Sequence, residues 1–157
     1  MNLASAFNTL ETFLAKLGAW LQSPLLLVIR LWWGWSCTQT GWGKLHNLER
    51  TTNFFASLHL PAPKLSAIAA GGTECIGGAL LLLGLFTRFA SPALMFVMLV
   101  AYYTADREAL FAIFANTDKF TGADPFLFLF AALIVFVFGP GKLSLDALLR
   151  KKSESAK

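Results

Sequence analysis

The sequence predicts an all-α protein, a bundle of four transmembrane helices with short amphipathic helices at the membrane interface. Hydrophobic residues make up 56% of the 157 residues, charged residues only 14%, and the mean hydropathy is +0.60. A typical soluble domain carries roughly a quarter charged residues. A chain of this size also buries too small a share of its surface to hide so many apolar side chains from water. Because the apolar residues gather into four separate runs, the membrane is their expected solvent.

Residues 1–22 predict an amphipathic helix that lies in the membrane interface. Their apolar side chains recur at spacings of three and four residues, which is the period of one helical face. These side chains are Leu3, Phe7, Leu10, Phe13, Leu14, Leu17 and Trp20. A helix with one apolar and one polar face lies along the membrane surface rather than across it.

Residues 23–146 form the predicted four-helix membrane domain. Ser23 and Pro24 suit the N-cap and the first helical position of the first span, and Asp124-Pro125 opens the last span in the same way. The pair Ser91-Pro92 marks the beginning of the third span. The four apolar runs lie at residues 25–41, 64–86, 89–105 and 125–138.

Two shorter apolar faces lie between the predicted spans. The first contains Phe54, Phe55 and Leu58 and ends at the turn Pro61-Ala-Pro63. The second contains Leu110, Phe111, Ile113 and Phe114 and ends at Asn116. Because each follows an odd-numbered span, both faces are expected on the same side of the membrane.

The distribution of lysine and arginine favours cytoplasmic termini. With four spans both termini share one side, and short cytoplasmic loops carry the excess of positive charge. Residues 147–157 form a basic tail that suits anionic lipid headgroups. No basic stripe or motif indicates nucleic-acid binding. The side with the termini holds Lys16, Arg88, Lys142, Arg150, Lys151, Lys152 and Lys157, against Lys44, Arg50, Lys64, Arg107 and Lys119 on the other.

Two charged residues, Arg30 and Glu74, fall inside predicted spans. A charge at the bilayer centre costs roughly 2.5–3.5 kcal/mol on insertion scales, so neither side chain is expected to face lipid. Arg30 lies ten residues from Trp20, and Glu74 lies twelve residues from Phe86. On antiparallel helices these depths are similar, so the two side chains could meet and form a pair. Two interpretations remain open: a structural ion pair that fixes helix register, or a polar site in which Glu74 and Arg30 act on a substrate headgroup or proton.

Further residues are candidates for binding a ligand. Trp33 and Lys44 share a helical stripe with Arg30, and Gly71 and Gly78 share a face with Glu74, where glycine admits a neighbouring backbone or a flat ligand. At the outer end of the bundle, His46 is a candidate to pass protons at the mouth of a site, and Tyr103 ends the third span. No metal site is predicted, because the two cysteines form no CxxC pair and have no Cys/His ligand spacing.

The ordered pieces of this sequence resemble the DoxX/DoxD family over roughly residues 24–146. Each piece is short, but together they form a specific set. They are Arg30, GWGKL at 41–45, FFASL at 54–58, LPAP at 60–63, ECIGG at 74–78, GLFTR at 84–88 and GPGKLSLD at 139–146. The resemblance implies a four-helix integral protein of bacterial inner membranes. It also implies recurring polar positions at Arg30, Lys44, Glu74, Arg88 and Asp146.

Named members of that family are subunits of a thiosulfate:quinone oxidoreductase or partners in a thiol-handling, oxidative-stress membrane complex. The resemblance therefore implies a quinone- or lipid-binding subunit of a membrane redox system. The cofactor stays open, with a quinone as the candidate. Arg30 or Lys44 would donate a hydrogen bond to a quinone carbonyl, and Glu74 would relay the proton that reduction consumes. Any enzyme activity would be that of a quinone-linked oxidoreductase subunit acting with a partner protein.

Three alternatives remain open. The first is a non-catalytic scaffold or assembly partner, and the second is a small-molecule transporter. The third is an isoprenoid isomerase, and this enzyme would need a second acid beside Glu74. The expected partners are membrane lipids and a partner redox protein, and a homo-oligomer stays open. A ligand site requires a lined cavity near Arg30, Trp33, Glu74 and Tyr103, whereas a scaffold requires that space to be filled by side chains.

Overall fold

The computed structural model describes residues 3–155, and within this range every regular element is an α-helix, which confirms the all-α class. Residues 1–2 and 156–157, the outermost parts of the predicted N-terminal helix and basic tail, lie outside the described residues. The helices are α1 (Leu3–His46), α2 (Leu48–Ser57), α3 (Pro63–Leu83), α4 (Thr87–Thr104), α5 (Arg107–Phe111), α6 (Thr117–Thr121), α7 (Asp124–Phe138) and α8 (Leu145–Glu154).

Within the described part of the chain, two helices are long and apolar enough to cross a membrane. They are the stretch Phe7–His46 of α1 and the whole of α3. The helix α7 is strongly apolar but has only 15 residues. By length and composition, the structure therefore supports two of the four predicted spans.

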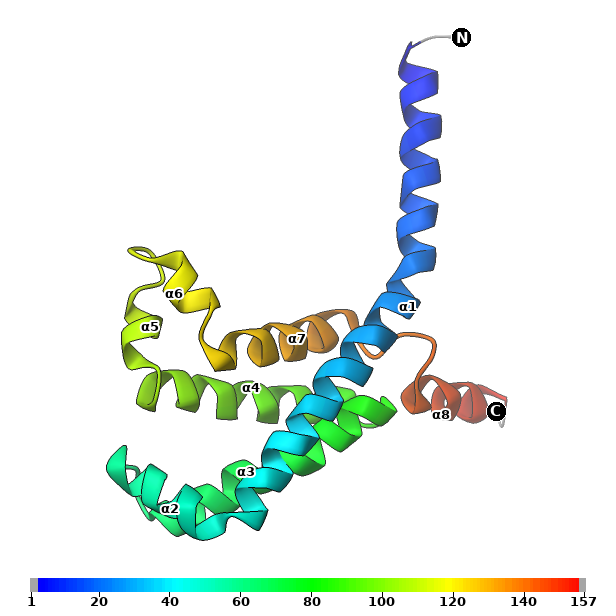
Figure 1. Ribbon diagram of the computed structural model, residues 1–157. Coiled ribbons are helices and arrows are strands. Elements are labelled where there is room, and N and C mark those ends of the chain that lie inside the picture. Colours follow the sequence, from blue (N-terminus) through cyan, green and yellow to red (C-terminus); the bar gives the residue numbers. More distant parts are fainter. Residues whose placement is uncertain (1–2, 156–157) are drawn as a thin grey trace.

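The helix α1 is continuous where the sequence predicts two helices. Ser23 and Pro24 lie inside it, so Ser23 is not an N-cap. The hydroxyl oxygen of Ser23 instead accepts a hydrogen bond from the backbone N–H of Lys142 at 3.3 Å. A proline removes only one intrahelical hydrogen bond and can kink a helix without ending it. The N-terminal half of α1 extends away from the other helices (Figure 1), and its Trp20 is 71% exposed.

Glycines bring α1 and α3 into close antiparallel contact. A Cβ atom on Gly78 would lie 2.6 Å from the backbone nitrogen of Thr38, and one on Gly34 would lie 2.7 Å from that of Leu82. Nearer the other end of the pair, Gly41 lies against the backbone of Gly71. Such distances exclude any larger residue without separating the helices. The glycines therefore fix the register of α1 against α3.

The core lies where α1, α3, α4 and α7 meet (Figure 1). Its buried side chains are Cys37, Leu81, Leu94, Ala132 and Val135. At the far end of α4, the buried Tyr102 stacks on Phe120 with 5.2 Å between ring centroids. Its hydroxyl donates to the Phe120 carbonyl at 2.7 Å, which anchors α6 to the bundle.

The helix α4 begins at Thr87, two residues before the predicted third span, and a distant carboxylate caps it there. Asp146, in the first turn of α8, accepts hydrogen bonds from the backbone N–H groups of Phe86 and Thr87 at 2.9 and 3.1 Å, and from the Thr87 hydroxyl at 2.9 Å. This satisfies donors that a helix otherwise leaves unpaired at its N-terminus. The same contacts hold α8 against the α3–α4 turn.

The predicted turn between the apolar face of Phe54, Phe55 and Leu58 and the next helix is confirmed. The helix α2 ends at Ser57 and α3 begins at Pro63. Between them His59 and Ala62 adopt left-handed backbone conformations, with φ of 58° and 45°. The turn folds α2 back against α3, and this arrangement builds one wall of the site described below.

Candidate functional site

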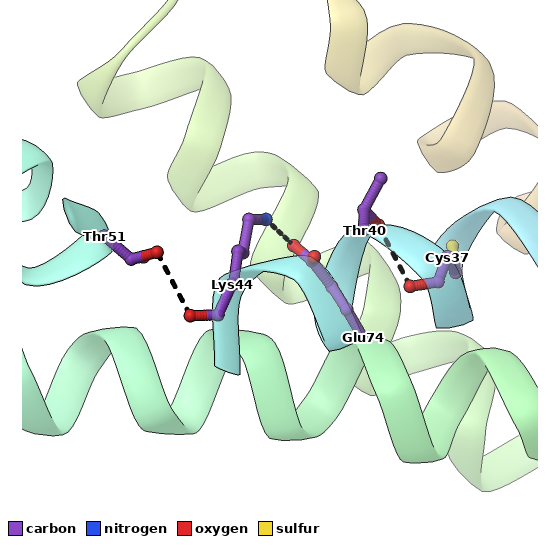
Figure 2. Close-up of polar contacts among 5 residues, drawn as sticks. All are labelled: Cys37, Thr40, Lys44, Thr51 and Glu74. Atoms are coloured by element: carbon purple, nitrogen blue, oxygen red, sulfur yellow. Dashed lines mark hydrogen bonds and ion pairs between the residues drawn. The ribbon is translucent and has the colours of Figure 1, made fainter. Parts of the chain in front are cut away.

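The buried carboxylate of Glu74 forms an ion pair with Lys44 (Figure 2). Glu74 lies in the middle of α3 and is 1% exposed, whereas Lys44, in the last turn of α1, is 34% exposed. The hydroxyl of Thr51 on α2 donates to the Lys44 carbonyl at 3.1 Å. This bond ties α2 to the turn of α1 that carries the ammonium group.

The predicted pairing of Arg30 with Glu74 is wrong. Arg30 is buried at the opposite end of the α1–α3 pair, where its guanidinium donates to the carbonyl of Leu143. A Cβ atom on Gly84, which has φ +67°, would collide with that guanidinium. The sequence estimate assumed equal depths for the two residues. The glycine register instead sets Arg30 opposite the end of α3 and brings Lys44 to Glu74.

An apolar cavity of about 340 Å³ opens beside this ion pair, between α2, α3 and α4. Small-molecule sites in proteins have volumes of roughly 300–1,000 Å³ and apolar walls with few polar groups. The polar residues that line the cavity are Lys44, Ser66, Thr73, Glu74 and Thr104, and its larger apolar ones are Phe54, Phe55, Leu58, Leu60, Phe96, Val97 and Val100.

One polar atom of the cavity lining lacks a partner. Glu74 Oε2 is buried and receives no hydrogen bond from any residue in the described range 3–155. The hydroxyls of Ser66 and Thr104 already donate to backbone carbonyls at 2.7 Å each. An unpaired buried acceptor costs about 1–3 kcal/mol, so Oε2 favours a ligand that brings a donor.

The predicted ligand-binding residues are not gathered in one place. Lys44 lines the cavity, but Gly71 and Gly78 contact α1 through the backbone. Trp33 packs edge-on against Phe128 on α7, with 5.1 Å between the centroids. His46 lies against the ring of Trp42 at 4.2 Å.

Tyr103 lies outside the cavity beside Glu74. It is 58% exposed and lines an adjoining hollow near the α2–α3 turn, which shares Leu58, Leu60, Phe96, Val100 and Thr104 with that cavity. The guanidinium of Arg107 lies 5.4 Å from the centre of its ring.

Sequence reasoning missed the residues of α2 and α4 that complete the cavity. Phe54 and Phe55 were recognised only as part of an interfacial apolar face, and Phe96 and Val97 only as part of a span. The signal was the apolar face of Phe54, Phe55 and Leu58, since a short amphipathic helix after a span needs an apolar surface to cover. The structure packs this helix, α2, against α3, and α4 forms the other wall of the cavity next to Glu74.

Beyond the ends of the long helices, two carboxylates have shifted pKa values. Burial raises the pKa of Asp106, and the charge of Asp124 raises it further. The pKa of Glu108 is lowered by a hydrogen bond from Lys119 and by the charge of that residue. The Lys119–Glu108 ion pair has a 2.7 Å separation and both side chains exposed. It therefore provides a solvated counterpart to the buried Lys44–Glu74 pair.

The fold and the site define a helical protein of membrane type, with an ion pair at an apolar cavity. The DoxX family matches residues 25–107, more than half of the chain, and this protein belongs to the DoxX family. The match includes both cavity charges and ends before the α7–α8 loop. A relative in Haemophilus influenzae, described as an uncharacterized protein, is 29% identical over 134 residues, which cover 80% of this chain and 83% of that protein. No solved structure matches the chain.

Proposed function

We propose that the protein is a four-span integral protein of a bacterial inner membrane with cytoplasmic termini. The 18 residues of α4 and the 15 residues of α7 extend about 27 and 22 Å at the helical rise. Local thinning of the bilayer accommodates spans somewhat shorter than its hydrocarbon core. Large apolar side chains are exposed on both helices, including Phe89, Phe130 and Phe136. The distribution of lysine and arginine supports the orientation.

We further propose that the cavity binds a flat lipophilic ligand, a quinone or a lipid, and that the protein acts as the membrane subunit of a redox system. The observation that carries this proposal is the meeting of an apolar cavity with the Lys44–Glu74 pair, whose Oε2 is buried without a partner. In this setting an amphiphile with an apolar body and a small polar head fits better than a wholly polar or wholly apolar molecule.

A quinone suits the two charged groups. The ammonium of Lys44 is a donor for a carbonyl oxygen, and Glu74 Oε2 is an acceptor for a hydroxyl proton. A bound quinone supplies the capacity to take up two electrons and two protons. Glu74 would accept one quinol proton at Oε2 or return it to the reduced quinone, and Lys44 would stabilise the carboxylate when that proton has left. Burial shields the Glu74 carboxylate from water, whereas the Lys44 ammonium group stays partly exposed.

Extraction in mild detergent, followed by mass spectrometry of the co-purifying small lipophiles, tests this function. We expect the wild-type protein to retain a quinone or another isoprenoid, and Glu74→Gln and Lys44→Met to lose most of it. Lys119→Met and Glu108→Gln, which disrupt the exposed ion pair, should retain it as the wild type does. Retention of bulk phospholipid alone by all five proteins would contradict the proposal and favour a scaffold role.

A further inference from the structure

A second hollow of about 340 Å³ lies at the opposite end of the bundle, between α1, the α7–α8 loop and α8. Arg88 at the beginning of α4, Lys142 in the loop and Arg150 on α8 all line it. These three residues are far apart in the sequence, and the fold brings them together. The backbone N–H of Lys142 donates to Ser23 on α1, which holds the loop in place.

This hollow carries a net positive charge, because three cations and one carboxylate line it. The acid in its lining is Asp146, and both carboxylate oxygens of Asp146 are occupied in capping α4. Within residues 3–155, no ion pair involves Arg88, Lys142 or Arg150. Three cations around one cavity attract an anion, and arginine guanidinium groups are well shaped to hold the oxygens of a phosphate.

Apolar side chains adjoin the cations. A neighbouring hollow shares Arg88, Asp146 and Arg150 with the first and is also lined by Phe86, Phe89 and Leu149. All three apolar side chains are exposed, with Phe89 at 79%. An anionic head in the first hollow therefore has an apolar surface directly beside it. This combination suits an acyl chain attached to a phosphate better than it suits a free ion.

We propose that Arg88, Lys142 and Arg150 form a binding site for the phosphate headgroup of an anionic phospholipid, with an acyl chain along Phe86, Phe89 and Leu149. The proposal rests on the membrane placement given above but uses none of the residues of the Lys44–Glu74 cavity. The site lies at the end of the bundle where the α3–α4 turn and the α7–α8 loop meet, which the sequence predicts to be cytoplasmic. Anionic lipid is concentrated in the cytoplasmic leaflet of the membrane. It would anchor α8 and the α7–α8 loop to the bilayer surface.

Native mass spectrometry of the full-length protein in detergent, titrated with phosphatidylglycerol, tests the site. We expect Arg88→Gln and Arg150→Gln each to weaken binding about tenfold, the loss that corresponds to one charge-assisted contact. The matched controls are Lys151→Gln and Lys152→Gln, which remove the same charge from α8 outside the hollow. These variants should bind within about twofold of wild type, a change well under 1.4 kcal/mol. Glu74→Gln should bind phosphatidylglycerol normally even if it loses a quinone.

Each other outcome overturns the proposal. Equal losses in the Lys151 and Lys152 variants would show diffuse attraction to a basic tail rather than a built site. Displacement of the lipid by millimolar inorganic phosphate would identify a small-anion site instead. Equal binding of phosphatidylcholine and phosphatidylglycerol by the wild type would exclude headgroup recognition. Circular dichroism of Arg88→Gln and Arg150→Gln checks that the helices are retained.

Discussion

Replacing Gly78 by alanine is expected to destabilise the protein by about 3 kcal/mol, the upper part of the range for an overpacked interface. The new methyl group would lie 2.6 Å from the backbone nitrogen of Thr38 and 2.8 Å from the carbonyl oxygen of Gly34. Backbone atoms cannot rotate away as a side chain can, so α1 and α3 must separate. Separation along this interface also draws Lys44 away from Glu74.

Gly72 provides the matched control, because it lies on the same helix and a Cβ atom there meets nothing within 4 Å. Gly72→Ala should leave stability unchanged or raise it by up to about 1 kcal/mol through helix propensity. SDS-induced unfolding in mixed micelles, followed by circular dichroism, measures both variants. Equal stabilities for Gly78→Ala and Gly72→Ala would contradict the close packing of α1 on α3.

Removing the lysine of the buried ion pair should cost more stability than removing its acid. Lys44→Met leaves the carboxylate of Glu74 without its ion-pair partner at 1% exposure, and breaking a buried pair in this way costs about 3–5 kcal/mol. Glu74→Gln leaves an ammonium group that is 34% exposed and can reach water. We therefore expect a loss of only about 1 kcal/mol from Glu74→Gln, the net value of one hydrogen bond.

The double variant Lys44→Met/Glu74→Gln tests the physical cause of this asymmetry. With no charge left buried, it should be more stable than Lys44→Met alone, since replacing both members of a buried pair is often neutral. The same unfolding assay measures all three proteins. Additive losses in the double variant would mean that the two side chains do not interact, against the contact seen between them (Figure 2).

Local signals in the sequence predicted the ends of several helices correctly. The pair Asp124-Pro125 lies in the first turn of α7 as predicted, although Ala123 is the N-cap. Pro63, which was assigned to the preceding turn, is the first residue of α3, where proline is favoured because its missing N–H is not needed. Pro24 gave the same signal and was misleading, because α1 continues through it. No local feature distinguishes Pro24 from the prolines that begin a helix. A helix continues through a proline when the residues before the proline are themselves helical, and the proline alone does not show this.

Which buried charges pair depends on the register of α1 against α3, and the spacing of residues in the sequence does not give this register. Depth along a helix was estimated from Trp20, which is exposed on a part of α1 that leaves the bundle (Figure 1). The true register is set by backbone contacts of Gly34, Gly41 and Gly78. Glycines on one face were visible in the sequence. Which glycine of α1 faces which glycine of α3 is a property of the packed pair.

The cavity was likewise only half accessible to prediction. Lys44 and Glu74 were recognised as candidates, but Phe54, Phe55 and Phe96 join them through tertiary packing of α2 and α4. The cap that Asp146 provides to α4 spans some 60 residues of sequence and has no local signature. Long-range contacts of this kind determine which side chains a residue meets in the folded protein. The sequence alone indicates mainly which residues, such as charged ones, are rare inside a membrane.

The central claim is that the cavity beside Lys44 and Glu74 holds a lipophilic ligand, and thermal unfolding with a short-chain benzoquinone tests it most directly. A ligand that binds the folded state raises the melting temperature as its concentration exceeds Kd. We expect such a rise for wild type and for Ala15→Phe on the exposed half of α1, and none for Ala70→Phe, which fills the cavity. No rise in the wild type, or an equal rise in Ala70→Phe, would contradict the account.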